Sequence, residues 1–167
     1  VVKEFVSREG TRIRALDSVS FETMSGHITC LVGPTGSGKS TVLRIVSGLE
    51  RADEGTVLVK GQTPAGLKGR IGFLTQRHTL FPWMRVRENI GLPLFLKNIP
   101  GRDIGKRVAA ICGQLGLAGA GELYPYELSG GMLQRAALGR LLATDSRLWL
   151  MDEPFAALDE RSRHQLQ

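Results

Sequence analysis

A glycine-rich segment in the first third of the chain has the residues needed to bind a nucleoside triphosphate. Residues 33–40 read Gly-Pro-Thr-Gly-Ser-Gly-Lys-Ser and follow the apolar run 27–32. Glycines let backbone N–H groups approach a phosphate, and a helix that begins at the loop directs its positive end toward the anion. Lys39 can bridge the β- and γ-phosphates, and the Ser40 hydroxyl can ligate Mg²⁺. The residues expected to contact the nucleotide are Gly33, Pro34, Thr35, Gly36, Ser37, Gly38, Lys39, Ser40 and Thr41.

Two adjacent carboxylates end an apolar run near the other end of the chain. Asp152 and Glu153 directly follow the run 148–151. At the end of a buried strand, one carboxylate can hold Mg²⁺, directly or through water, and the next can orient an attacking water. A solvated acidic turn is the alternative. The phosphate-binding loop in the same chain favours the metal and water roles.

A third group of residues could bind a second anion. Ser129, Gly130 and Gly131 precede a segment in which leucines recur at helical spacing. Serine is a good N-cap residue, and an ordinary helix cap with flexible glycines is the simpler interpretation. Glycines at a helix start also let backbone N–H groups approach a phosphate. The position of this segment upstream of Asp152 favours the phosphate-binding interpretation.

Hydrophobic patterning predicts the elements that would position these groups. Residues 1–26 are typical of short strands separated by turns, and the run 27–32 predicts a strand covered on both faces. A helix is expected over 39–49 after the phosphate loop, and a helical region over 81–143. Further strands are expected over 55–60, 70–75 and 147–151. Strand, glycine-rich loop and helix in this order is the context that a phosphate-binding loop requires.

Composition favours one globular domain. The chain has 167 residues, of which 42% are hydrophobic and 23% charged. No apolar run approaches the roughly 20 residues of a membrane helix, and the first residues lack a signal-peptide pattern, which favours the cytoplasm. The formal charge of +6 is scattered rather than clustered, so no nucleic-acid partner is expected. Cys30 and Cys112 lie in apolar runs and are expected to be buried and reduced.

The order of the motifs resembles the ATP-binding-cassette (ABC) ATPases over nearly the whole chain. The matching segments are 33–40, Gln76, 128–132, 148–153 and 157–159. The resemblance implies ATP and Mg²⁺ as cofactors, with Ser40, Gln76 and Asp152 as the metal-associated residues. It implies catalytic roles for Glu153, Gln76 and Lys39.

The same resemblance implies that two ATPase subunits pair, as a homodimer or with a related subunit. Ser129, Gly130 and Gly131 would then contact the γ-phosphate across the dimer, and Asp159 would lie in a loop at that interface. Phe5 is placed like the aromatic residue that stacks on adenine, although a strand residue is an equally good interpretation. Met132 stands where the family commonly has glutamine.

The implied architecture is an α/β P-loop NTPase with a RecA-like parallel core, an N-terminal antiparallel β-subdomain and a helical subdomain. The chain 1–167 would form one ABC ATPase domain. Within it, 1–76 and 135–167 would form the nucleotide-binding core with its β-subdomain, and 77–134 the helical subdomain with the signature motif. The family's switch histidine is expected outside the chain, because His164 lies too close to Glu153. The chain therefore resembles a fragment cut at both ends, with poor activity by itself.

Residues 80–90 and 154–159 are similar to importer ATPases of the nitrate, sulfonate and taurine type. An exposed Pro82-Trp83 pair would suit docking to an integral membrane permease subunit, at the cytoplasmic face of the cell membrane. Packing of Trp83 under its own loop is the alternative. Two other functions stay open: a non-transport ABC ATPase, and a nucleotide-binding module without turnover. The stretch from Gln76 to Ser129 lacks sustained heptads, which argues against the coiled-coil-bearing non-transport class.

Overall fold

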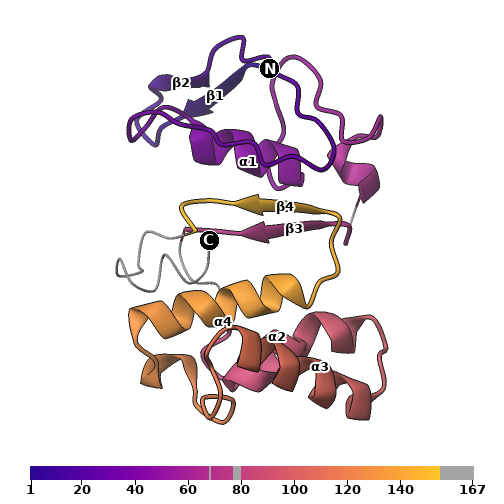
Figure 1. The fold of residues 1–167 in the computed structure, drawn as a ribbon. Helices are drawn as coiled ribbons and strands as arrows, with labels where there is room; N and C mark the ends of the chain where they lie inside the picture. Colours follow the sequence, from indigo (N-terminus) through magenta and orange to yellow (C-terminus); the bar gives the residue numbers. More distant parts are fainter. Residues whose placement is uncertain (68, 77–79, 155–167) are drawn as a thin grey trace. The chain divides into compact units, whose positions relative to one another are not determined.

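The structure is a computed structural model that describes residues 1–67, 69–76 and 80–154. The chain forms two compact units, Val1–Lys68 and Gly69–Gln167. Figure 1 shows the elements of each unit. None of the helices in the described parts of the chain has the length and apolar character needed to cross a bilayer.

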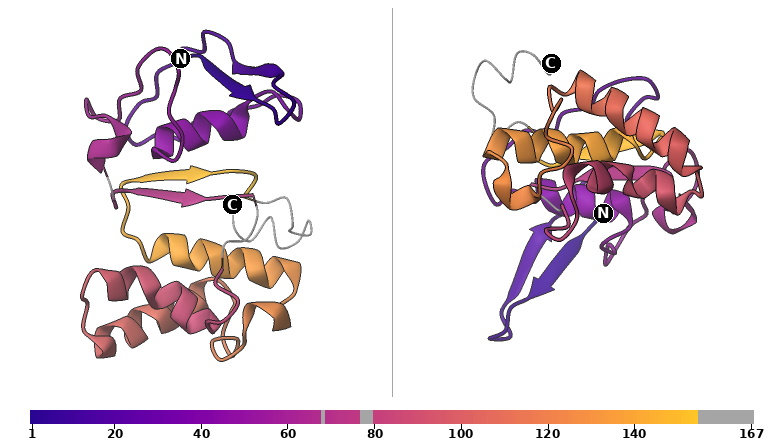
Figure 2. Two further views of the ribbon diagram at one scale, coloured as in Figure 1. Left: turned by 180° about the vertical axis from the view of Figure 1, so that it is seen from behind. Right: turned by 90° about the horizontal axis from the view of Figure 1, so that it is seen from below.

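The first unit combines an antiparallel hairpin with one helix. Its elements are β1 (Lys3–Val6), β2 (Arg12–Leu16), α1 (Lys39–Ser47) and the 3₁₀ helix η1 (Pro64–Leu67). The hairpin extends as a narrow two-stranded ribbon (Figure 2, right). Its turn is closed by the Ser7 N–H, which donates to the Thr11 carbonyl at 2.9 Å, and it includes Gly10 at φ 80°. That left-handed conformation favours glycine.

A buried lysine joins the hairpin to the segment after α1. The Lys3 ammonium lies 3.0 Å from the Glu50 carboxylate and 3.2 Å from Asp53. The Glu4 N–H also donates to Asp53, at 2.7 Å. The hydrogen bond with Glu50 contributes most to raising the pKa of Lys3, while the Glu4 N–H and Lys3 lower the pKa of Asp53. The apolar core beside this cluster is small and consists of Leu16, Val42 and Ile45.

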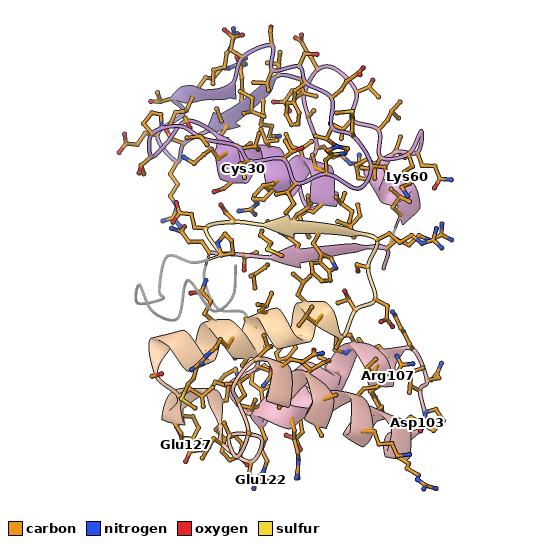
Figure 3. All side chains as sticks on the ribbon, in the orientation of Figure 1. Cys30, Lys60, Asp103, Arg107, Glu122 and Glu127 are labelled. Carbon is orange, nitrogen blue, oxygen red and sulfur yellow. The ribbon has the colours of Figure 1, made fainter. Side chains whose placement is uncertain are left out.

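Two strands expected in the first unit, over 27–32 and 55–60, do not form, and the only strands within the fully described short-strand region 1–26 are β1 and β2. Residues 27–32 have no strand assignment, and Ile28 and Val32 are each 94% exposed. Residues 55–60 make only the isolated bridge of Val59 with Gln62. A strand is stabilised by hydrogen bonds to a neighbouring strand, and no described residue forms a ladder with 27–32. Cys30, labelled in Figure 3, is exposed for the same reason. Cys112 is buried as expected.

The second unit contains a parallel strand pair and a helical layer. Its elements are β3 (Ile71–Leu74), α2 (Val86–Leu96), α3 (Gly101–Gln114), the 3₁₀ helix η2 (Pro125–Glu127), α4 (Gly130–Leu142) and β4 (Leu148–Met151). β3 and β4 run parallel, with Ile71 opposite Leu148 and Leu74 opposite Met151. α4 lies along one face of this pair, and α2 and α3 pack on the other side of α4 (Figure 1). The expected helix over 39–49 and the strands near 70–75 and 147–151 are thus confirmed to within two residues at each end, and the helical region expected over 81–143 extends from Val86 to Leu142.

Two glycines let α4 pack closely on its neighbours. A Cβ at Gly72 in β3 would lie 2.4 Å from Leu141 Cδ1 of α4. A Cβ at Gly139 would lie 3.1 Å from both Ile90 Cδ1 and Leu115 Cδ1. Contacts between carbon atoms are optimal at about 3.5–4.0 Å, so both positions favour glycine. This packing belongs to the main core, whose least exposed side chains include Val86, Ile90, Leu94, Leu117 and Ala136.

The antiparallel hairpin, the parallel strand pair and the helical layer expected from the sequence are therefore present in the described residues. The finer division of the chain into 1–76 with 135–167 and 77–134 stays a prediction.

Candidate functional site

The phosphate loop leads directly into α1, and its backbone conformation at that point requires glycine. Gly36 and Gly38 have φ of 84° and 87°, and Gly38 is the N-cap of α1. A Cβ at Gly38 would lie 2.5 Å from the Ala15 carbonyl oxygen and 2.6 Å from Leu16 Cδ2 in β2. The loop thus passes against β2 at a distance that only glycine permits. No acidic residue occupies the first turn of α1, so the positive end of the helix is free to attract an anion.

Lys39 is held against the loop by two carbonyl groups. Its ammonium donates to the Gly33 carbonyl at 2.9 Å and to the Pro34 carbonyl at 2.8 Å. Hydrogen bonds from a cation to an ionised phosphate are stronger than those to neutral carbonyls. A phosphate in the loop can therefore draw the ammonium away from these carbonyls. Ser40 lies beside Lys39 in the first turn of α1 and is exposed.

An open cavity of about 490 Å³ adjoins the loop, and Gly33, Pro34, Ser37 and Lys39 are among the residues that line it. The remaining lining is mainly apolar and includes Val42 of α1. Ligand pockets commonly have volumes of about 300–1,000 Å³ and combine an apolar lining with a few polar groups. The cavity next to the loop has a volume in this range and is largely open to solvent.

A second group of candidate residues meets where β3 and β4 end. The Asp152 N–H donates to the Leu74 carbonyl at 2.9 Å and so continues the parallel pairing beyond the strands. The Gln76 amide Nε2 donates to Glu153 Oε2 at 2.7 Å. Residues that follow different strands thus form one constellation, because the carboxyl ends of parallel strands lie at the same edge of a sheet.

Glu153 combines an exposed side chain with an unusual backbone. Its φ is 50°, in the left-handed region that non-glycine residues seldom adopt. Such a conformation costs on the order of 1–3 kcal/mol and persists where neighbouring contacts hold it. The carboxylate is an acceptor, and the donor from Gln76 orients one of its oxygens. The other oxygen can accept a proton from a water molecule.

The third group forms the start of α4. The Ser129 hydroxyl accepts a hydrogen bond from the Met132 N–H at 3.3 Å, which confirms Ser129 as the N-cap. Gly130 and Gly131 occupy the first turn, and Ser129 and Gly130 are exposed. The first turn carries no acidic side chain. This end of α4 therefore presents backbone N–H groups at a surface that an anion can reach.

The remaining candidates are placed as follows. Phe5 lies on β1, is 39% exposed, and has the Lys3 ammonium 5.2 Å from its ring centroid. Trp83 is 70% exposed, and its ring centroid lies 5.2 Å from that of Phe81. The exposed position agrees with the predicted surface role and not with packing under the loop. The predictions for Asp159 and His164 lie outside the described residues.

The sequence did not identify Asn89, whose hydrogen bonds hold the loop that carries Trp83. Asn89 is fully buried in α2, and its Oδ1 accepts a hydrogen bond from the Phe81 N–H at 2.8 Å. Its Nδ2 donates to the Phe81 carbonyl at 3.1 Å and to the Met84 carbonyl at 2.9 Å. One amide therefore ties the loop to the helix. The sequence did contain a signal for this role, because Asn89 stands beside Ile90 on the apolar side of a helix. An amide buried at such a position needs hydrogen-bond partners.

Charged side chains surround the exposed loop. Arg85 and Arg87 both pair with Glu122, which lies on the surface of the helical layer (Figure 3). The Arg85 guanidinium also lies 5.0 Å from the Tyr124 ring centroid, and this ring stacks on Tyr126. Aromatic and arginine side chains are common at protein–protein interfaces. The surface around Trp83 has this composition.

Comparisons with known proteins agree with these observations. Residues 16–156 match the family described as ABC transporter. The chain is 42% identical over 158 residues to an uncharacterized ABC transporter ATP-binding protein of Methanocaldococcus jannaschii, covering 95% of this chain and 59% of that protein. It is 46% identical over 155 residues to the sulfate/thiosulfate import ATP-binding protein CysA of Nocardia farcinica, covering 91% and 47%. The chain thus spans about half the length of these relatives.

Among solved structures, the chain resembles a dimeric ATP-binding cassette in a post-hydrolysis state, bound to ADP and phosphate. The TM-score is 0.92 with 31% sequence identity, and the match covers 99% of this chain and 77% of that one.

Proposed function

This chain belongs to the ABC transporter family, and from this we propose that it is the ATP-binding and ATP-hydrolysing part of an importer. The observation that carries the proposal is the hydrogen bond of Gln76 with Glu153 at the end of the parallel strand pair. It supports a hydrolytic role because it orients a carboxylate that follows directly on Asp152. The phosphate loop with its glycine-dependent turn supports a nucleoside triphosphate as the ligand, and the likeness to an ATP-binding cassette supports ATP.

In this proposal each residue has a distinct task. The Lys39 ammonium leaves the carbonyls of the phosphate loop and binds the β- and γ-phosphates, and backbone N–H groups of the loop hold the β-phosphate. The carboxylate of Glu153 orients a water molecule toward the γ-phosphate and accepts its proton. The Gln76 amide keeps that carboxylate in position. Positioning and electrostatic stabilisation account for most of the catalysis of phosphoryl transfer.

The candidate metal residues fit Mg²⁺ by their chemistry. Mg²⁺ prefers oxygen ligands, and Ser40, Gln76 and Asp152 offer a hydroxyl, an amide oxygen and a carboxylate. The Gln76 nitrogen bonds to Glu153, which leaves the amide oxygen for a cation. When bound, Mg²⁺ would neutralise charge on the phosphate oxygens.

We further infer that two ATPase subunits act together. The exposed start of α4 at Ser129, Gly130 and Gly131 would bind the γ-phosphate held by the paired subunit, and Asp159 would lie at the interface. Paired cassettes are supported by the dimeric form of the similar solved structure. The surface that contains Phe81, Pro82 and Trp83 would bind an integral membrane permease subunit at the cytoplasmic face of the membrane.

The transported solute is proposed to be a small anion. Sulfate is the first candidate, because relatives of this chain are named sulfate/thiosulfate import proteins. The sequence of residues 80–90 also suggests nitrate, sulfonate or taurine. Uptake by cells that express the full-length protein with its permease, measured for each solute in turn, distinguishes these substrates.

The nucleotide-binding proposal is tested with Lys39→Ala, measured by calorimetry with Mg-ATP. The affinity should fall from several-fold to hundreds-fold, because a hydrogen bond from a charged group contributes about 1.5–3 kcal/mol. Lys106→Ala is the matched control, since Lys106 is an exposed lysine of α3. Equal affinity of the wild type and Lys39→Ala would refute the proposed role. Phosphate release measured on the same samples separates an ATPase from a binding module without turnover.

A further inference from the structure

A buried glutamine of α4 contacts the main chain directly after Glu153. Gln134 is 7% exposed, and its amide Nε2 donates to the Pro154 carbonyl. A proline has no N–H, so its carbonyl is the only backbone hydrogen-bonding group that Pro154 offers. The contact joins a helix to a turn that lies 20 residues further along the chain.

The turn that Gln134 contacts needs external support. Glu153 has φ of 50°, a conformation that costs a non-glycine residue on the order of 1–3 kcal/mol and that neighbouring contacts must offset. Two amides restrain it from different elements. Gln76, beyond β3, donates to the Glu153 side chain at 2.7 Å, whereas Gln134 holds the main chain at the next residue.

The position of Gln134 is itself set by close packing. Ala136 and Ala137, on the same helix, are 0% and 3% exposed. Gly72 of β3 leaves only enough space for Leu141 of α4, as a Cβ at Gly72 would lie 2.4 Å from Leu141 Cδ1. Well-packed interiors transmit displacement instead of absorbing it. A movement of α4 would therefore move the Gln134 amide and the turn at Glu153 with it.

We propose that Gln134 is a positioning residue for Glu153, a role that rests on the proposed function of Glu153 in ATP hydrolysis. It acts through the Pro154 carbonyl and the backbone conformation of Glu153, and it touches neither the nucleotide nor the water. Because α4 begins at the Ser129 cap, the same rigid helix connects the anion-binding end to the catalytic carboxylate. An anion bound at the start of α4 can thus influence the orientation of Glu153.

The test uses Gln134→Met in the full-length protein, because methionine keeps the length and approximate volume of glutamine but donates no hydrogen bond. We expect kcat for ATP hydrolysis to fall by about 10- to 100-fold, since a small displacement of a catalytic group can reduce the rate by that order. The KM and the Kd for Mg-ATP should change by less than about twofold, because no phosphate-binding group is altered. Gln114→Met, at the exposed end of α3, is the control.

A second measurement does not depend on turnover. In nucleotide-free protein, the carbonyl ¹³C resonance of Pro154 should shift in Gln134→Met and stay in place in Gln114→Met. If Pro154 shifts while kcat is unchanged, the positioning role is refuted. If kcat, KM and thermal stability change together, Gln134 is only structural and the proposal is also refuted. If the wild type shows the Pro154 contact but hydrolyses no ATP, the failure lies in the proposed function itself.

Discussion

Replacement of Gly38 by alanine should destabilise the phosphate-loop unit by about 2–5 kcal/mol. Two separate costs add. A non-glycine residue in the left-handed conformation costs about 1–2 kcal/mol, and Gly38 has φ of 87°. The new Cβ would also lie 2.5 Å from the Ala15 carbonyl oxygen and 2.6 Å from Leu16 Cδ2. Overpacking of this kind costs about 1–3 kcal/mol, because the backbone oxygen and the buried Leu16 cannot both move aside.

The loop provides its own matched control. Gly36 has φ of 84°, but a Cβ there would meet nothing within 4 Å. Gly36→Ala should therefore incur only the conformational cost, about 1–2 kcal/mol. Gly66→Ala provides the baseline, because Gly66 has neither a positive φ nor a neighbour within 4 Å. The expected order of destabilisation is Gly38→Ala, then Gly36→Ala, then Gly66→Ala.

The assay must report on the correct unit. Every tryptophan and tyrosine of the chain lies beyond Lys68, at positions 83, 124, 126 and 149, so intrinsic fluorescence follows the second unit. Native-state hydrogen exchange of the α1 amides, without nucleotide, follows the first. Equal exchange free energies for Gly38→Ala and Gly36→Ala would refute the reasoning, because the contact with β2 would then contribute nothing.

Two further predictions concern the partner surface and acid stability. In full-length protein, Trp83→Ala should leave ATP affinity unchanged and weaken co-purification with the permease subunit. The reason is that truncation of a buried interface tryptophan often costs about 2 kcal/mol or more of binding free energy. Impaired ATP binding with normal assembly would contradict this prediction. The pKa of Asp53 lies below its ordinary value of 3.8, because it accepts hydrogen bonds from the Glu4 N–H and from Lys3. A carboxylate whose pKa is lower in the folded protein than in the unfolded chain stabilises the fold at any pH above the unfolded-state pKa. This contribution is lost as the pH falls through the folded-state pKa. Asp53→Asn should therefore lower stability at pH 7 and flatten its decline below about pH 4, measured by exchange of the α1 amides; an unchanged pH profile would exclude this role of Asp53.

The local sequence determined most of the candidate site. The glycines before Lys39 predicted a phosphate loop followed by a helix, because glycine lets backbone N–H groups approach an anion. The cap at Ser129 followed from its hydroxyl and the helical spacing after it. The apolar run before Asp152 predicted a strand that ends in carboxylates. Each of these features depends on a few consecutive residues and their own conformational preferences.

Only the tertiary structure decided which distant groups meet. The apolar run 27–32 was wrongly predicted as a strand, because an extended segment becomes a strand only when another strand supplies its hydrogen bonds. The contacts of Gln76 with Glu153, of Gln134 with Pro154 and of Asn89 with the Trp83 loop were invisible to spacing arguments. A glutamine on a helix face can point to solvent or to a buried carbonyl. The choice depends on how closely that helix packs on the sheet, which is a property of the assembled fold.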